Sequence, residues 1–389
     1  SGLESGQNSV ITGTDGRYSY ARGYGAEIPG SQRELVAAKS GTNIRLTINR
    51  DVQWVAAEAI TQAVKDSAAT SGTVIVMDPR TGAIIAHATA PTFDPNNASS
   101  ITLDKLRNPA VQDVYEPGST GKVITVAAAM EEGLITPESV FTIPYKMKVA
   151  DEYFHDHEKH PTQRLTTTGL LAVSSNTGSI QIGQKLGKDR LYEYLRKFGM
   201  GQSTNSKLPG ESAGSLLQVK DWSGTSLPTF AFGQGYSLTA MQTTSVFATI
   251  ANNGVRVSPS ILAGVVDESG KYTQAKENPS VRVLSEQTSQ NMRAMMESVV
   301  SQNGTAPTAA IPGYRVAGKT GTANRYNTVC GCYSGYTASF VGFAPADAPE
   351  FVVSVTIQDP KGMHWGGVLA GPVFKKVMSF VLQSKRVQP

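Results

Sequence analysis

Hydrophobic and polar positions alternate along the chain with two periods, one typical of strands and one of helices. Residues 44–48 (IRLTI) alternate as a strand does. Residues 50–67 carry apolar residues at helical spacing, with Asp51 as the expected N-cap. Residues 72–90 contain two β-branched runs separated by Asp-Pro-Arg-Thr-Gly at 78–82, which predicts a hairpin with a tight turn.

The remaining periodic segments place helices in the middle of the chain and strands near its end. Helical patterns dominate from about 100 to 300, as in residues 123–133 and 238–254. Strand patterns return at 314–326, 336–347 and 350–360, and an amphipathic helix follows at 370–385. Strands at both ends of a helical middle predict an α+β fold with one sheet and a helical insertion.

These patterns suggest two units of very different size. Residues 1–43 are rich in Gly, Ser and Tyr and show no sustained period, so we expect them to be the remnant of an N-terminal domain. Residues 44–389 form the main domain, with sheet parts at about 44–95 and 301–389. The range of about 96–300 is the expected helical subdomain.

Composition excludes some classes of protein. Of the 389 residues, 40% are hydrophobic and 17% charged, as in a globular protein with a large core. The net charge of +4 is scattered, and no Lys/Arg block indicates nucleic-acid binding. No window approaches the 18 consecutive apolar residues of a membrane span. The opening SGLESGQ, without an initiator Met, indicates a piece of a longer protein whose anchor would lie upstream.

The two cysteines, Cys330 and Cys332, stand very close together in NTVCGCYSG. Such spacing strains a disulfide, and two thiols alone cannot complete a zinc site. We therefore expect two incidental loop thiols in preference to a redox pair.

Candidate chemistry begins with Ser119 and Lys122, at the head of the apolar run VITVAAAM. Pro117-Gly118 breaks the chain before Ser119, so the serine is expected in the first turn of a helix, where free N–H groups favour developing negative charge. Lys122 follows on the same face. Apolar neighbours would lower the pKa of its amine, so that it could take the serine proton as a general base. Alone, Ser-x-x-Lys is a weak signal, since it far more often marks a cap serine and a lysine that reaches solvent than a catalytic pair.

Two further motifs strengthen that signal. Ser174-Ser175-Asn176 and Lys319-Thr320-Gly321-Thr322 follow in the order of the Ser-x-x-Lys, Ser-x-Asn and Lys-Thr-Gly set of β-lactamases and penicillin-binding proteins. Ser174 could pass a proton between Lys122 and a leaving amine. Asn176 could bind a substrate amide through its donor and acceptor.

The Lys-Thr-Gly segment is expected to be an edge strand to which an extended peptide can add. Lys319, Thr320 and Thr322 could bind a carboxylate, and the backbone N–H groups of Ser119 and Thr322 could form an oxyanion hole. Strict alternation places the side chains of 319 and 322 on opposite faces. Either a twist or bulge in the strand brings both side chains to one face, or one of the two residues contacts the substrate through its backbone alone.

With these three motifs, the chain resembles class B penicillin-binding proteins, the peptidoglycan D,D-transpeptidases. Residues 2–16 resemble the end of the family's pedestal domain, residues 230–242 its Gly-x-Gly segment, and residues 336–347 the strand after Lys-Thr-Gly. The resemblance implies an antiparallel five-stranded sheet flanked by helices, with a helical subdomain. It implies Ser119, Lys122 and Ser174 as catalytic residues, Asn176 and Lys319–Thr322 as substrate-binding residues, and no cofactor.

The amino-acid sequence of residues 116–133 and 154–176 is most similar to that of the cell-division (septal) branch of the family. The resemblance therefore implies stem peptides ending in D-Ala-D-Ala as substrate and β-lactams as acylating ligands. It also implies a membrane glycosyltransferase and divisome proteins as partners, and an N-terminal anchor at the extracytoplasmic face of the membrane.

Two other motifs were weighed against this function. FHDHEKH holds His155, His157 and His160 and could bind a divalent metal, but a polar, hydrogen-bonded loop is the preferred interpretation, and no metal site is expected. Gly233-Gln234-Gly235 lacks the further glycine and preceding strand of a dinucleotide fingerprint, so close packing is expected there.

Two rival functions stay open. A serine β-lactamase shares the first chemical step but needs an added base, and no Glu-x-x-x-Asn arrangement stands in a suitable helix between Asn176 and Lys319. A non-catalytic β-lactam sensor or divisome scaffold would not need the intact Ser119–Lys122 pair.

Overall fold

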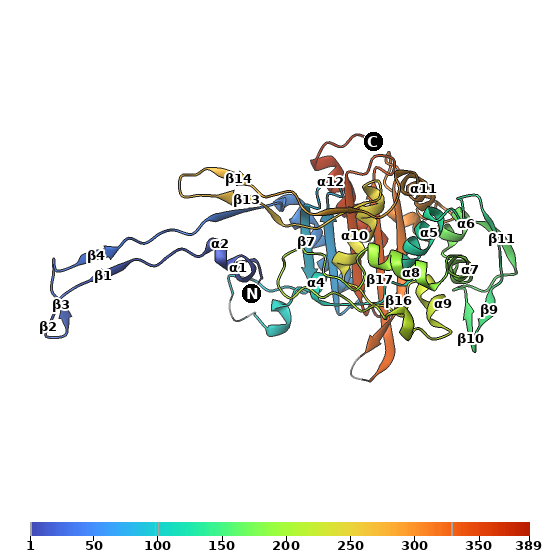
Figure 1. The fold of residues 1–389 in the computed structure, drawn as a ribbon, viewed down its shortest axis with the longest axis horizontal. Helices are drawn as coiled ribbons and strands as arrows, with labels where there is room; N and C mark the ends of the chain where they lie inside the picture. The colour runs from blue at the N-terminus through green and yellow to red at the C-terminus, as the bar shows by residue number, and fades with distance from the viewer. Residues whose placement is uncertain (1, 98, 100, 328–329) are drawn as a thin grey trace.

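A five-stranded antiparallel sheet forms the centre of the protein (Figure 1). The structure is a computed structural model that describes residues 2–97, 99, 101–327 and 330–389. The strands follow the spatial order β16 (Ala317–Asn327), β17 (Cys332–Ala344), β18 (Phe351–Gln358), β6 (Ser71–Met77) and β7 (Ile84–Ala90). Both ends of the chain thus contribute to one sheet, as the sequence predicts.

The β6–β7 hairpin shows how local chemistry starts the sheet. The side chain of Asp78 accepts a hydrogen bond from Arg80 N at 2.8 Å, and Gly82 adopts a positive φ of +73°. A Cβ at Gly82 would lie 2.3 Å from the carbonyl oxygen of Ser258, so only glycine fits this approach. The predicted turn is therefore confirmed.

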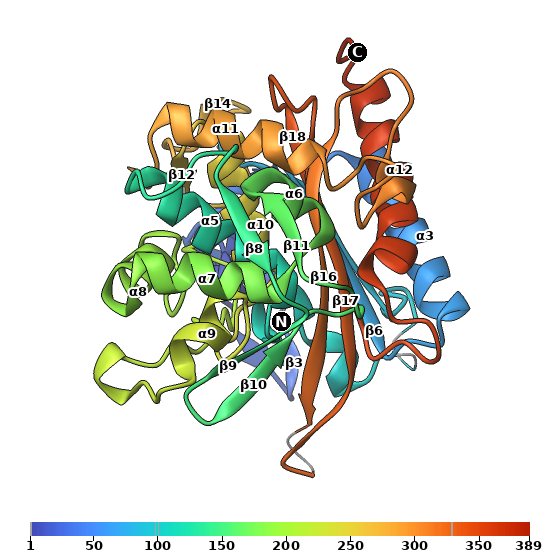
Figure 2. The same ribbon diagram turned by 90° about the vertical axis from the view of Figure 1, so that its right-hand side faces the viewer.

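Two long helices cover one face of the sheet (Figure 2). They are α3 (Arg50–Asp66) and α12 (Gly366–Ser384), which pack on the sheet and on each other. The rings of Phe374 on α12 and Phe340 on β17 meet edge to face, 4.7 Å between centroids. The N-cap of α3 is Asn49, whose side chain accepts from the N–H groups of residues 51 and 52, so the expectation of Asp51 is wrong by two positions.

The other face of the sheet is covered by α10 (Ala240–Ala251), every residue of which is buried. A capping box fixes its start, because the side chains of Thr239 and Gln242 each bond the other's backbone N–H. Around it lie α4 (Pro109–Gln112), α5 (Lys122–Glu131), α6 (Thr167–Val173), α7 (Asn176–Leu186), α8 (Lys188–Lys197), α9 (Ser226–Ala231) and α11 (Glu286–Glu297). Short 3₁₀ turns are η2 (Leu103–Leu106), η3 (Gly118–Gly121), η4 (Val219–Asp221) and η5 (Pro307–Ala309).

The middle of the chain is less helical than its periodicity predicts. It also contains β8 (Val140–Ile143), β9 (Lys146–Val149), β10 (Glu152–His155), β11 (Gln163–Thr166), β12 (Val255–Val257), β13 (Leu262–Val266), β14 (Tyr272–Gln274) and β15 (Ser280–Arg282). These strands have three to five residues, too short for an alternating pattern to stand out among long helices. Strand β13 pairs with β5 (Asn43–Leu46), so distant parts of the chain form one small sheet.

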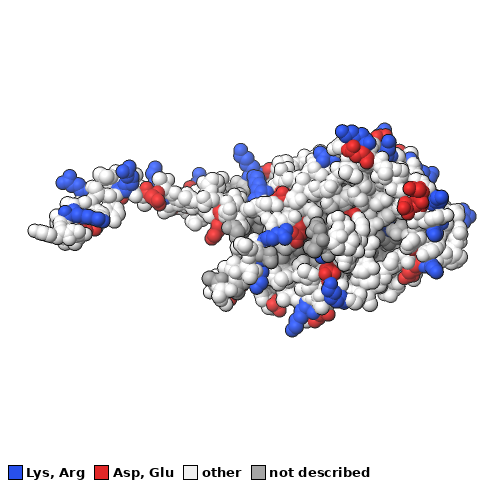
Figure 3. Space-filling model, turned by 90° about the horizontal axis from the view of Figure 1, so that it is seen from below, with Lys and Arg blue, Asp and Glu red and all other residues white. Residues whose placement is uncertain are grey.

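The N-terminal segment projects from the body as a long arm (Figure 1). It begins with α1 (Gly2–Gly6) and α2 (Asn8–Ile11), which lie beside the body, and extends through β1 (Arg17–Ser19), β2 (Arg22–Gly23), β3 (Ala26–Glu27) and β4 (Arg33–Val36). Basic and acidic side chains are interspersed over the face of the body in Figure 3. Among the described residues, no helix has the length and apolar character needed to cross a bilayer.

We expect Asn49→Ala to lower the free energy of unfolding by about 1 kcal/mol, because two N–H groups at the start of α3 lose their acceptor. Urea denaturation measures the change. Asn49→Asp keeps a side-chain acceptor and should stay close to the wild type. An equal loss in both variants would contradict the capping role.

Candidate active site

Ser119 lies in the 3₁₀ turn η3, which runs directly into α5. The residue before it, Gly118, has a positive φ of +53° and donates its N–H to Gly233 O at 2.8 Å. Ser119 is half-buried, and its hydroxyl forms no hydrogen bond with any residue that the structure describes. The serine therefore stands at the head of a helix, as predicted, with its hydroxyl available to a reacting group.

Three glycines let this turn lie against its neighbours. A Cβ at Gly233 would lie 1.9 Å from Gly118 O, and one at Gly321 would lie 3.0 Å from Pro117 O. A Cβ at Gly118 would lie 3.0 Å from the Cβ of Ala323. The turn is thus held between the Gly233–Gly235 segment and strand β16, which confirms close packing as the role of those glycines.

Lys122 is fully buried at the first position of α5. Its Nζ donates to Ser174 O at 2.5 Å, to Asn176 Oδ1 at 2.7 Å and to Ser174 Oγ at 3.2 Å. Burial lowers the pKa of the amine to about 7, although the charge of Asp156 acts in the opposite direction. Close to neutral pH, Lys122 can therefore exist as the uncharged base that the sequence predicts.

Ser174 occupies a break between two helices. It is the C-cap of α6 in the left-handed conformation, with φ of +62°, and Ser175 then caps α7 through its hydroxyl. Lys319 Nζ donates to Ser174 Oγ at 2.8 Å, so one hydroxyl contacts both Lys122 and Lys319. The structure therefore brings the Lys122, Ser174, Asn176 and Lys319 side chains together.

The register of strand β16 shows on which face of the strand each motif side chain lies. Its register against β17 is regular from Ala317 to Asn324, so no bulge separates Lys319 from Thr322 and their side chains alternate. Thr322 Oγ1 accepts from Gly366 N at 3.1 Å, and Thr320 Oγ1 lies 2.9 Å from Thr305 Oγ1. The bulge that could have brought the two side chains to one face is therefore absent between Lys319 and Thr322. Lys319 nevertheless reaches Thr320 Oγ1, at 3.4 Å, through its long side chain.

Lys319 is also fully buried, and its pKa is lowered well below the ordinary range, first by burial and then by the charge of Lys122. A carboxylate bound beside Lys319 would act in the opposite direction and favour the ammonium. Occupancy of the site by an anion and protonation of Lys319 are therefore coupled.

Comparison with known proteins agrees with this geometry. Residues 72–379 match the family described as "Penicillin binding protein transpeptidase domain". The chain belongs to this family. It is 39% identical to the penicillin-binding protein PbpB of Mycolicibacterium smegmatis over 99% of this chain and 61% of that protein, and 33% identical to peptidoglycan D,D-transpeptidase FtsI of Buchnera aphidicola over 100% and 66%.

A solved structure shows the same fold. Penicillin-binding protein 3 of Mycobacterium tuberculosis complexed with ampicillin superposes with a TM-score of 0.90 and 36% identity, over 99% of this chain and 84% of that one. The chain spans about three fifths of the length of the mycobacterial PbpB proteins that it matches.

Asp156 is a buried residue of this transpeptidase domain that sequence reasoning did not single out. Its carboxylate accepts from Ser175 Oγ at 2.7 Å, from Asn176 N at 2.5 Å and from Thr177 N at 2.9 Å, and it lies 3.0 Å from His160 Nε2. Asp156 thus fixes the start of α7 from the FHDHEKH loop. The sequence analysis preferred a polar, hydrogen-bonded loop here to a metal site, and the contacts of Asp156 agree with that interpretation, although its support of α7 was not foreseen.

Glu116 is a second residue that the motifs did not reveal. Its Oε1 accepts from Tyr333 OH at 2.9 Å and from Gly235 N at 3.2 Å, and burial raises its pKa. Glu116 therefore links three segments around Ser119: the loop before the serine, the Gly-x-Gly turn and the end of the β16–β17 hairpin. We assign it a positioning role.

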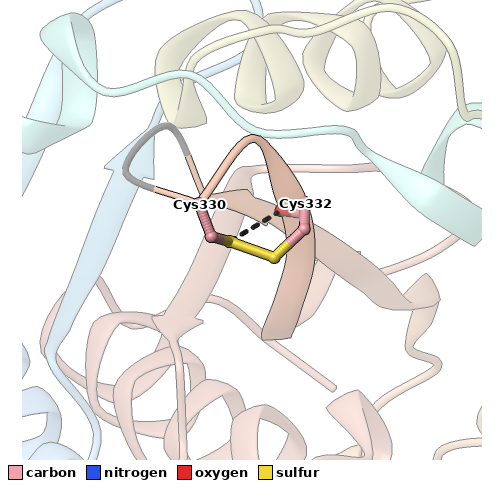
Figure 4. Close-up of a disulfide and its surroundings, with 2 residues drawn as sticks. All are labelled: Cys330 and Cys332. Atoms are coloured by element: carbon pink, nitrogen blue, oxygen red, sulfur yellow. Dashed lines mark hydrogen bonds between the residues drawn. A yellow bond between two sulfur atoms is a disulfide. The ribbon is translucent and has the colours of Figure 1, made fainter.

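The two cysteines lie beside Tyr333, and their bonding differs from the expectation of two free thiols. Cys330 and Cys332 form a disulfide, shown in Figure 4, so the expectation of two free thiols is wrong. Their Cα atoms lie 5.2 Å apart, within the range that a disulfide spans, because the backbone turns at Gly331 with φ of +63°. The disulfide constrains the chain next to the tyrosine that contacts Glu116.

We expect the reaction of Ser119 with a penicillin to accelerate as pH rises through about 7, because Lys122 becomes neutral there. In Asp156→Asn the charge that raises the pKa of Lys122 is lost, so this limb of the pH–rate profile should move to lower pH. Stopped-flow measurement of acylation at several pH values tests this. Asp151→Asn, an exposed carboxylate in the same segment, is the matched control, and a limb that does not move in Asp156→Asn would contradict the assignment.

We expect Tyr333→Phe to slow acylation about fivefold, since a hydrogen bond of about 1 kcal/mol that positions the Ser119 loop is lost. The pKa of Glu116 should also rise further, because this hydrogen bond lowers it. Tyr326→Phe is the control, since that exposed ring touches Tyr333 without a hydrogen bond from its hydroxyl to Glu116. Equal losses in the two variants would show that the effect does not come from the Tyr333–Glu116 hydrogen bond.

Proposed function

We propose that the protein is a serine D,D-transpeptidase that cross-links peptidoglycan stem peptides and is acylated by β-lactams. The observation that carries the proposal is the convergence of Lys122 and Lys319 on the hydroxyl of Ser174, in a domain whose Ser119 turn packs against an edge strand. The Buchnera relative is named a peptidoglycan D,D-transpeptidase, and the mycobacterial structure holds a β-lactam, which supports this choice.

In the first step Ser119 Oγ attacks the carbonyl carbon of the penultimate D-Ala, and its proton passes to neutral Lys122. The backbone N–H groups of Ser119 and Thr322 would stabilise the oxyanion. The peptide C–N bond then breaks, and the leaving amine receives a proton through Ser174 Oγ. Because Lys122 Nζ donates a hydrogen bond to this hydroxyl, Ser174 Oγ can take the proton from Lys122 as it gives its own proton to the leaving amine.

In the second step an amine from a neighbouring stem attacks the ester carbon. Its proton returns through the same groups, the new amide forms, and Ser119 leaves with its hydroxyl restored. Strand β16 is at the edge of the sheet, so its outward backbone groups can pair with an extended donor peptide. Lys319 and Thr320 would bind the terminal carboxylate, and Asn176 a substrate amide.

We further propose the biological setting that the family resemblance implies. Residues 1–43 would be the remnant of a pedestal domain and residues 44–389 the transpeptidase domain, with sheet parts at about 44–95 and 301–389 and a helical subdomain at about 96–300. The arm-like course of the N-terminal segment supports this division. The full-length protein would be anchored at the extracytoplasmic face of the membrane and would act in septal synthesis with a glycosyltransferase and divisome proteins.

A serine β-lactamase is the nearest rival function, and a non-catalytic β-lactam sensor is the second. The sensor would not need Lys122 to be buried with a pKa of about 7, an arrangement that suits a base. The β-lactamase would show rapid, continuous nitrocefin turnover, whereas the transpeptidase should show one stoichiometric burst.

Incubation with a penicillin should add one ligand mass to the intact protein, and peptide mapping should place it on Ser119. Ser119→Ala should show no adduct, and Lys122→Ala should lose turnover of a thioester substrate while its fold persists. An adduct that remains in Ser119→Ala would end the proposal. Turnover that persists in Lys122→Ala would remove the lysine from its assigned role.

A further inference from the structure

A second cleft, of about 430 Å³, lies between α8 and the β12–β15 pair. It is lined by residues of α8, β12 and β15 and contains none of the residues assigned to the active site. Four basic side chains contribute to its lining: Arg196, Lys197, Arg256 and Arg282. The single acidic residue in the lining is Glu193, whose carboxylate lies 2.7 Å from Lys197 Nζ.

Arg256, like Arg196, is half-buried, whereas Lys197 and Arg282 are exposed. A Cβ at Gly199, which has a positive φ of +97°, would lie 2.2 Å from Arg256 Nη1, so the guanidinium rests on the turn after α8. Burial lowers the pKa of Arg256, and no described residue accepts a hydrogen bond from it or pairs with its charge. A guanidinium has five donors, so this one presents unused donors to the cleft.

The other two arginines are held in place by backbone carbonyls. Arg196 Nη1 donates to Met200 O at 3.1 Å and to Gly201 O at 2.9 Å. Arg282 Nη1 donates to the carbonyls of residues 253 and 284, at 2.9 and 3.0 Å. These contacts fix both side chains through one nitrogen and leave the remaining donors of each guanidinium for other partners.

Some exposed arginines, such as Arg17 and Arg164, have no carboxylate partner among the described residues, whereas others do. Arg80, Arg107, Arg190 and Arg315 each pair with a carboxylate within 3.3 Å. None of the three cleft arginines does so within the described part of the chain. Like charges gathered in one cleft repel, and an arrangement of this kind is stabilised when an anion bridges them.

We propose that this cleft binds an oxyanion carrying at least two negative charges, of the phosphate or diphosphate class. The planar guanidinium groups match such oxygens in pairs, and Arg256 would provide the least solvated contact. The volume admits a ligand larger than a single phosphate. The anion could belong to a lipid headgroup or to a phosphorylated molecule in solution.

Titration calorimetry with inorganic pyrophosphate at physiological salt tests the site in the intact chain. Wild type should bind, and Arg256→Gln should weaken binding about ten- to hundredfold, since a charge-assisted contact is lost. Arg282→Gln should weaken it too. Lys375→Gln/Lys376→Gln removes two exposed charges on α12 and is the control for non-specific attraction, with unchanged affinity expected.

Binding to vesicles that contain phosphatidic acid distinguishes a lipid headgroup from a phosphorylated molecule in solution as the source of the anion. Vesicle binding that Arg256→Gln abolishes would assign a headgroup, whereas binding of pyrophosphate alone would assign a soluble ligand. Acylation of Ser119 by penicillin and the thermal midpoint should be unchanged in Arg256→Gln, which shows that the variant is folded. No binding to either probe at millimolar concentration, or equal binding by wild type and Arg256→Gln, overturns the proposal.

Discussion

The side-chain amines of Lys122 and Lys319 are both buried, and both donate a hydrogen bond to the hydroxyl of Ser174. The site depends on how the protein offsets the free-energy cost of burying these two amines together. An uncompensated buried ammonium is very costly, so the fold must either provide acceptors or favour the neutral amine. It does both. Lys122 receives three oxygen acceptors, whereas Lys319 is driven toward the neutral form by burial and by its neighbour's charge. The reactivity of the site follows from this balance between acceptors that stabilise an ammonium and burial that favours the neutral amine.

Those acceptors exist only because the chain breaks between α6 and α7. Ser174 ends one helix in the left-handed conformation, which turns its carbonyl and hydroxyl toward Lys122, and Ser175 begins the next helix. Asp156 then fixes the first N–H groups of α7 from a loop about twenty residues earlier. A helix that continued through residue 174 would direct these groups elsewhere and leave Lys122 without partners.

Around this centre, close backbone approaches determine where the nucleophile stands. Gly118, Gly233 and Gly321 let the Ser119 turn fit between the Gly-x-Gly segment and the edge strand β16. Glu116 ties the same turn to Tyr333, beside the Cys330–Cys332 disulfide. The nucleophile is therefore held by contacts from both the Gly233–Gly235 segment and the β16–β17 hairpin, which explains why residues distant in the sequence affect one hydroxyl.

The sequence by itself determined the longer helices, the strands of the central sheet and the motif residues, because hydrophobic periodicity and turn chemistry act over a few neighbouring positions. It predicted the sheet from both chain ends, the helix after Ser119 and the set of Lys122, Ser174, Asn176 and Lys319. Only the tertiary structure decided that Lys122 and Lys319 share Ser174, that Asp156 and Glu116 support the site, and that the two cysteines pair. Contacts such as Glu116–Tyr333 join segments as far as 217 residues apart, which no local pattern encodes, and the cysteine pair depends on the backbone turn at Gly331.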